Sequence, residues 1–110
     1  MIDDTLAKIE ARLNSTEAIP VEKRRELQQL LATLKAEVGK LSKTHAEQAQ
    51  SIAGFTEVSA HEATRSHRKA ALIEASLSGL KSSVEGMEAE HPKVVQIVNR
   101  LATILSNMGI

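Results

Sequence analysis

The residues whose types are best suited to chemistry are His61-Glu62 and, further along, His67. In the zinc-protease pattern two histidines stand four residues apart, so that both imidazoles reach one ion from the same helical face. A spacing of six places the two side chains about 120° apart around an ideal helix. The pair cannot readily hold one ion, so we predict no metal and no cofactor. A solvated helix face is the expected setting for these residues.

A basic group follows directly, formed by Arg65, Arg68 and Lys69, and Lys23-Arg24-Arg25 is a second one. Proteins that bind nucleic acid usually carry a basic excess, and single-strand binders add stacking aromatic side chains. Here 14 basic residues are balanced by 14 acidic ones, and Phe55 is the sole Phe, Tyr or Trp. Nucleic-acid binding is therefore not the first choice, and a regulatory contact with nucleic acid through Arg65, Arg68 and Lys69 is kept as the alternative function. These three basic residues, together with His61 and Glu62, are the candidate interaction residues.

The composition argues against an enzyme and favours a small helical protein. The sequence holds no serine elbow, phosphate loop or glycine-rich nucleotide motif, and it lacks cysteine, tyrosine and tryptophan. Its 110 residues suit one domain, 1–110, with a thin aliphatic core that oligomerisation would help to stabilise. No apolar run approaches the roughly 20 residues of a membrane span, and the N-terminus is acidic. We expect a cytoplasmic protein without membrane contact.

The apolar spacing predicts the elements that position these residues. A short helix begins near Asp3 and Asp4, and a long helix begins at Pro20. The long helix carries a row of apolar residues of the coiled-coil type, Leu27, Leu31, Leu34, Val38 and Leu41. The row becomes polar at His45, and Thr44-His45-Ala46-Glu47 matches a capping box. The helix therefore either breaks near residue 43 or runs on to Gly54.

A second long helix is predicted from a capping box at Ser59-Ala60-His61-Glu62 to about Ala89. Gly54-Phe55-Thr56 is the best turn candidate before it, so the two long helices would form an antiparallel hairpin. The apolar row of the second helix is the candidate seam between copies of the chain: Ile73, Leu77, Leu80, Val84 and Met87. A stripe of small residues that includes Gly79 lies behind this seam. It would either let another backbone come close or form a poorly optimised solvent-exposed face.

The last helix is predicted between Pro92 and Gly109. Its apolar residues recur at steps of three and four, the spacing of one helical face: Val94, Ile97, Val98, Leu101, Ile104, Leu105 and Met108. Pro92 suits a first turn, and Gly109 suits a left-handed ending in which Ile110 folds back onto Leu105. This helix is the densest apolar surface of the chain, and much of the fold should depend on covering it.

His45 lies where the row of the first long helix turns polar. A histidine buried there could switch an interface, because its charge changes near neutral pH. The alternatives are a core histidine with a hydrogen-bond partner and a histidine at a frayed helix break.

Four segments of the sequence stand out together: Gly54-Phe55, Ala60–Arg65 (AHEATR), Glu90-His91-Pro92 and the ending Leu105–Ile110 (LSNMGI). These segments resemble a known family of small bacterial helical proteins, catalogued as a domain of unknown function (DUF 4404). The similarity covers most of the chain, and the ending is its most specific part. The resemblance implies a bacterial helical protein and assigns no catalytic or binding residue.

We therefore predict an all-α fold, an elongated bundle built on the long hairpin with a short N-terminal and an amphipathic C-terminal helix. The expected function is a structural or protein-interaction module that self-associates through its helical seams. A homo-oligomer is the expected assembly, with an unidentified protein as a further partner.

Overall fold

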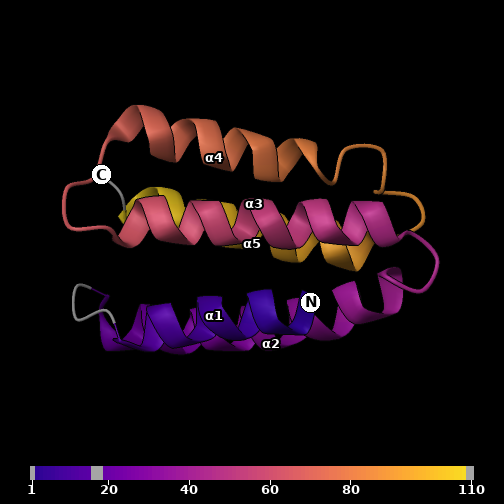
Figure 1. The fold of residues 1–110 in the computed structure, drawn as a ribbon, viewed down its shortest axis with the longest axis horizontal. Helices are drawn as coiled ribbons and strands as arrows, with labels where there is room; N and C mark the ends of the chain where they lie inside the picture. The colour runs from indigo at the N-terminus through magenta and orange to yellow at the C-terminus, as the bar shows by residue number, and fades with distance from the viewer. Residues whose placement is uncertain (1, 16–18, 109–110) are drawn as a thin grey trace.

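The third helix of the chain organises the fold. The computed structural model describes residues 2–15 and 19–108, which form five α-helices: α1 (Ile2–Ser15), α2 (Val21–Leu41), α3 (Ala46–Thr64), α4 (Ala70–Ser82) and α5 (Pro92–Met108). Successive helices run in alternating directions, and α3 lies between α4 on one side and α1 with α2 on the other (Figure 1). α3 contacts each of the other four helices. The prediction of an all-α fold is confirmed.

The aliphatic rows of α2 and α5 form much of the core, as their spacing predicts. Both helices begin beside a proline, because Pro20 precedes α2 and Pro92 is the first residue of α5. Every residue of the predicted row on α2 is buried, and α5 buries all of its predicted residues except the half-buried Met108. The two helices pack together, and an ion pair of 2.6 Å joins Arg100 Nη2 to Glu26 Oε2. The predicted contact of Ile110 lies outside the described residues.

The predicted hairpin turn at Gly54-Phe55-Thr56 is wrong, because these residues lie inside α3. Gly54 is exposed, and open space surrounds the position of a Cβ atom there. A glycine on an exposed helical surface costs about 1 kcal/mol relative to alanine, which is too little to end a helix held by its neighbours. The helix continues because its buried face continues: Ala49, Ile52, Ala53, Thr56, Ser59, Ala60 and Ala63.

The predicted second long helix is also wrong. Ser59 is not a cap but a buried residue in the middle of α3, and the chain leaves the helix after Thr64. Arg65 and Lys69 have extended backbone angles, so the polar stretch 65–69 forms a bend between two helices. A polar segment without an apolar side has nothing to bury as a helix. The true hairpin partners are therefore α3 and α4, joined by this bend.

Of the two alternatives left open for the first long helix, the structure shows the break near residue 43. α2 ends at Leu41, and α3 begins after His45, whose side chain makes no capping hydrogen bond. The predicted Thr44 cap is one residue early, because His45 is the N-cap residue of α3. The Thr44 hydroxyl instead lies 2.8 Å from His45 Nδ1. His45 itself is exposed, which excludes the buried switch and matches the alternative of a histidine at a helix break.

Ser59 offers a test of the packing around α3. Its hydroxyl is fully buried and has no hydrogen-bond partner among the described residues. A buried polar group without a partner costs about 1–3 kcal/mol in mutational data, and alanine is also the better helix former. We therefore expect Ser59→Ala to raise the free energy of unfolding by about 1 kcal/mol, measured by urea denaturation with circular dichroism.

The matched control for Ser59 is Ser76→Ala, the same change at another buried serine. Ser76 Oγ donates a hydrogen bond of 2.9 Å to the carbonyl of Ile73, so its removal loses a bond as well as a hydroxyl. We expect no gain of stability from Ser76→Ala. A fall in stability for Ser59→Ala would contradict the interpretation of its hydroxyl as unpaired.

Candidate functional site

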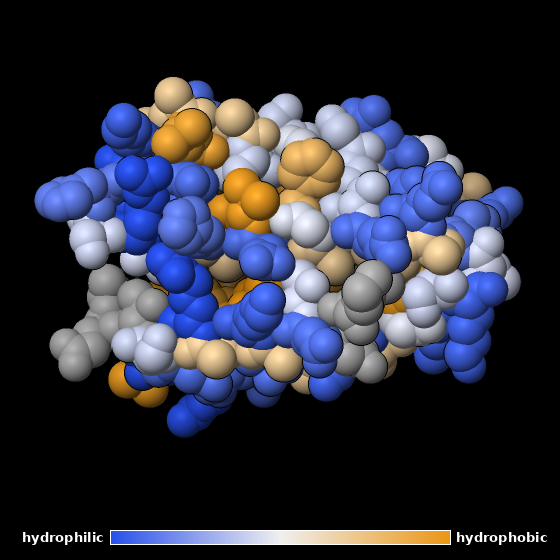
Figure 2. Space-filling view, viewed as in Figure 1, coloured by the Kyte–Doolittle hydropathy of each residue, from blue (hydrophilic) through white to orange (hydrophobic). Residues whose placement is uncertain are grey.

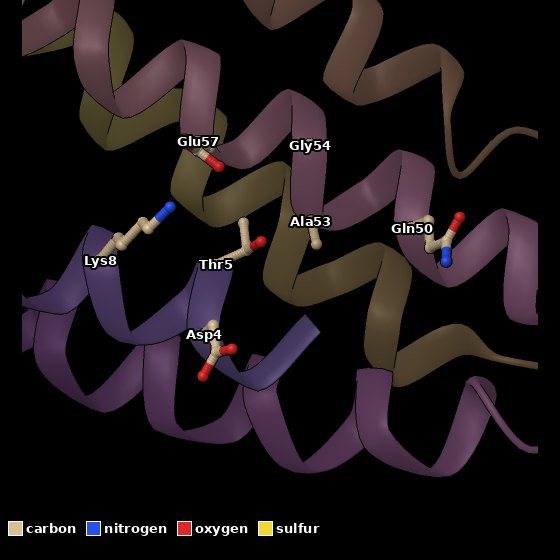
Figure 3. A pocket seen from close by; sticks show the side chains of 7 residues that line it. All are labelled: Asp4, Thr5, Lys8, Gln50, Ala53, Gly54 and Glu57. Carbon is tan, nitrogen blue, oxygen red and sulfur yellow. The ribbon is translucent and has the colours of Figure 1, made fainter. Parts of the chain in front are cut away.

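A groove between α1 and α3 contains His61 and Glu62. One part of it, about 500 Å³, is lined by residues of both helices: Lys8, Ile9, Arg12, Glu57, Val58, Ala60, His61 and Glu62. It continues into a second hollow of about 400 Å³, with which it shares Lys8 and Glu57. In Figure 3, Lys8 and Glu57 point toward one another across that hollow. The groove is thus lined by side chains of both charges.

The charged residues at the end of α3 are engaged with one another. Arg65 Nη1 donates a hydrogen bond of 2.9 Å to Glu62 Oε1, and His61 Nε2 lies 3.8 Å from Glu62 Oε2. On the facing helix, Arg12 Nε donates to Thr64 Oγ1 over 2.7 Å. The candidate interaction residues His61, Glu62 and Arg65 therefore lie together and make polar contacts with one another within the chain.

The two basic groups of the sequence meet at the end of α5. Lys23 and Arg68 line a common cavity of about 190 Å³ beside Met108. Arg68 Nη1 donates to the Met108 carbonyl over 2.9 Å, where the last carbonyls of α5 carry partial negative charge. Lys69 is exposed at the start of α4. Arg68 thus caps the C-terminal end of α5, whereas Arg65 pairs with Glu62.

The candidate seam between copies is part of the core of a single chain. All five of its residues are buried in the hydrophobic cluster: Ile73, Leu77, Leu80, Val84 and Met87. Val84 and Met87 lie beyond α4, in the connection where Gly86 takes a φ of +83°. Their apolar surface is already covered within the chain, so it does not require a second copy.

An apolar patch missed at the sequence level lies instead on α3 and α4. We define the patch as Phe55, Val58 and Leu72, whose side chains are 40%, 47% and 41% exposed. Apolar residues gather over these two adjacent helices in Figure 2. The sequence did contain a signal for this patch, because Val58 and Leu72 are large apolar residues that do not belong to the predicted seam. Phe55 was missed because it was assigned to a turn.

The small-residue stripe of α4 has a definite role in this patch. A Cβ atom on Gly79 would come within 2.3 Å of Phe55 Cε1, which is closer than real side chains approach. Gly79 therefore makes room for the Phe55 ring against α4. The ring extends from α3 to Gly79 of α4 and still presents a large part of its surface.

Comparison with known proteins identifies the family. A family model described as "Domain of unknown function (DUF4404)" matches residues 27–110, as the resemblance predicted. The match contains the patch and the candidate residues of α3, whereas α1 precedes it. No curated protein and no solved structure matches the chain. None of the described helices combines the length and the apolar character that crossing a bilayer requires.

Proposed function

Because the chain belongs to the DUF4404 family, whose description assigns no activity, we propose a function from its geometry: a protein-interaction module that pairs with a second copy of itself. The contact surface is the patch of Phe55, Val58 and Leu72. The single observation that carries this proposal is that three large apolar side chains on adjacent helices are 40–47% exposed. Grouped apolar surface of this kind marks interaction sites more often than scattered single residues do.

A second copy is the partner that best fits the properties of the patch. The chain has a formal net charge of zero, so two copies approach without net repulsion. In a two-fold dimer the same patch lies on both sides of the interface, so each apolar surface covers the other. Gly79 leaves room for the Phe55 ring against α4, so the ring can stay in the patch without displacing that helix.

Nucleic-acid binding has weaker support. Phosphate contacts need free cationic side chains, whereas Arg65 is paired with Glu62 and Arg68 with the carbonyl of Met108. Lys69 is then the remaining exposed member of that group. A basic surface of this size, on a chain without net positive charge, does not favour an anionic polymer.

The proposal predicts weak, concentration-dependent dimerisation. Three side chains supply only part of the roughly 800 Å² per partner that a stable interface buries, so we expect dissociation in the micromolar range or above. Val58→Asp places a charge in the patch and should weaken the dimer at least tenfold. Sedimentation velocity over a wide range of protein concentration measures both quantities.

The matched control is Val21→Asp, the same change at a valine that is 68% exposed outside the patch. Val21 is the first residue of α2, where a carboxylate also suits the helix dipole. Its dimerisation should equal that of the parent. A parent chain that stays monomeric at several hundred micromolar, or equal weakening by both variants, would reject the proposal.

A further inference from the structure

We infer that His45, Glu90 and His91 form a binding site for one divalent transition metal ion, for which Zn²⁺ is the probe. One ligand atom from each residue lies within 4.8 Å of the other two. The two imidazole centroids are 5.6 Å apart, and their planes meet at 78°. Among the residues whose side chains the structure describes, this is the single cluster of three such side chains. The site revises the expectation of no metal, which considered only His61 and His67.

The fold brings the three residues together from distant parts of the sequence. His45 ends the connection from α2 to α3, and Glu90 and His91 end the connection from α4 to α5. Both connections lie at the same end of the bundle (Figure 1). The side-chain amide of Gln48, in the first turn of α3, also donates to the carbonyl of Ser83, at the start of the connection from α4 to α5.

Helix hydrogen bonds fix the backbone of both histidines. The His45 N–H donates to the carbonyl of Leu41 over 2.7 Å, and the His45 carbonyl accepts from Ala49 over 3.0 Å. His91 is held in the same way: its N–H donates to the carbonyl of Met87 over 2.8 Å, and its carbonyl accepts from the N–H of Val95 over 3.3 Å. Only the side chains must move to bind an ion. Such preorganisation lowers the cost of forming a site.

The side chains need a modest movement. Donor atoms around a tetrahedral Zn²⁺ are about 3.3 Å apart when each bond is about 2.0 Å, against separations of up to 4.8 Å here. His45 and Glu90 are exposed and His91 is half-buried, so rotation of the first two can close the site. Their exposure also leaves the fourth position of the ion to water.

Thr44 contacts one of the two ring nitrogens of His45. Thr44 Oγ1 lies 2.8 Å from His45 Nδ1 and 3.5 Å from the carbonyl of Leu41. When the hydroxyl donates to the carbonyl, it accepts a hydrogen bond from the protonated Nδ1. The Nε2 lone pair of His45 is then available to the ion. A second hydrogen bond of this kind is the usual support of a metal-binding histidine.

The donor set determines the class of ion. Two imidazole nitrogens and one carboxylate oxygen suit Zn²⁺, Cu²⁺ and Ni²⁺, whereas Mg²⁺ and Ca²⁺ prefer oxygen ligands alone. Both histidines precede the first turn of a helix, where the dipole disfavours a cation. The carboxylate of Glu90, beside His91, supplies a negative charge that offsets this effect of the dipoles.

The test is calorimetric titration of the tag-free chain with ZnCl₂, since a polyhistidine tag would itself bind the ion. We expect one ion per chain and at least a tenfold loss of affinity in His45→Ala and in His91→Ala. His67→Ala is the matched control, because it removes an exposed histidine from the bend between α3 and α4. Millimolar Mg²⁺ should not compete with Zn²⁺.

Thermal melting gives a second readout that does not depend on heats of binding. At a free Zn²⁺ concentration of a hundred times the Kd, the melting temperature of the parent should rise by about 10 °C. The two cluster variants should lose this rise while keeping parent-like helix content, since His45 makes no side-chain cap. Three results would overturn the site: no Zn²⁺ binding, one ion shared by two chains, or equal weakening by His67→Ala.

Discussion

Leu80→Ala is expected to lower the free energy of unfolding by about 3–4 kcal/mol, because it removes three carbon atoms from a closed aliphatic core. Leu80 lies on α4 and is 0% exposed within the single chain. A domain of this size is stabilised by only about 5–15 kcal/mol in total. The variant should therefore unfold at a much lower urea concentration, which denaturation followed by circular dichroism will measure.

The concentration dependence of this loss distinguishes a core residue from an interface residue. Leu80 belongs to the row predicted as a seam between copies, yet the fold covers it within one chain. Its loss of stability should therefore be the same at low and high protein concentration. A residue at an interface would instead destabilise the assembly by an amount that depends on concentration.

Leu72→Ala is the control for Leu80→Ala, because it makes the same deletion on the same helix. Leu72 is 41% exposed, so its truncation should cost less than about 1 kcal/mol under conditions where the parent is monomeric. Equal losses at the two positions would mean that α4 does not bury Leu80. A loss at Leu80 that vanishes with increasing protein concentration would restore the seam between copies.

The sequence predicted the helices whose buried residues are large. Leucine, isoleucine and valine at steps of three and four mark one helical face without ambiguity, and α2 and α5 were located in this way. Pro20 and Pro92 marked their starts. The ends of the helices were predicted less accurately. A helix ends where its side chains cease to be buried, and their burial depends on the neighbouring helices.

α3 was divided because its buried face is made of small residues. Alanine, serine and threonine on that face have no strong apolar period, so Gly54 and the cap-like sequence at Ser59 dominated the prediction. The true bend at residues 65–69 contains neither glycine nor proline. Its signal was a run of polar residues with no apolar side, which indicates the absence of burial rather than a specific turn.

The candidate sites depended on tertiary structure to different degrees. His61, Glu62 and Arg65 lie within five residues of one another at the end of α3, so their contacts are local in the sequence. His45 and His91 come together only because two connections lie at the same end of the bundle. No local pattern contains that information. The exposed patch likewise required knowing that α4 folds back onto α3, which brings the helix of Leu72 against the helix of Phe55 and Val58.

The small face of α3 also explains how one helix can contact four others. Side chains no larger than threonine make up this face apart from Ile52, which lets the surrounding helices come close. Any larger side chain there must displace a helix or take a strained rotamer. The central helix should therefore tolerate enlargement far less than the outer helices do.

Ala60→Leu tests this requirement directly. Ala60 is buried in the hydrophobic cluster, and leucine and alanine differ little in helix propensity. The change should therefore report packing, and we expect it to lower the free energy of unfolding by about 2–3 kcal/mol in urea denaturation. Ala46→Leu makes the same enlargement at an exposed position of α3 and should stay within about 0.5 kcal/mol of the parent. If Ala60→Leu were as stable as Ala46→Leu, the small residues of α3 would not be needed for the close approach of the surrounding helices.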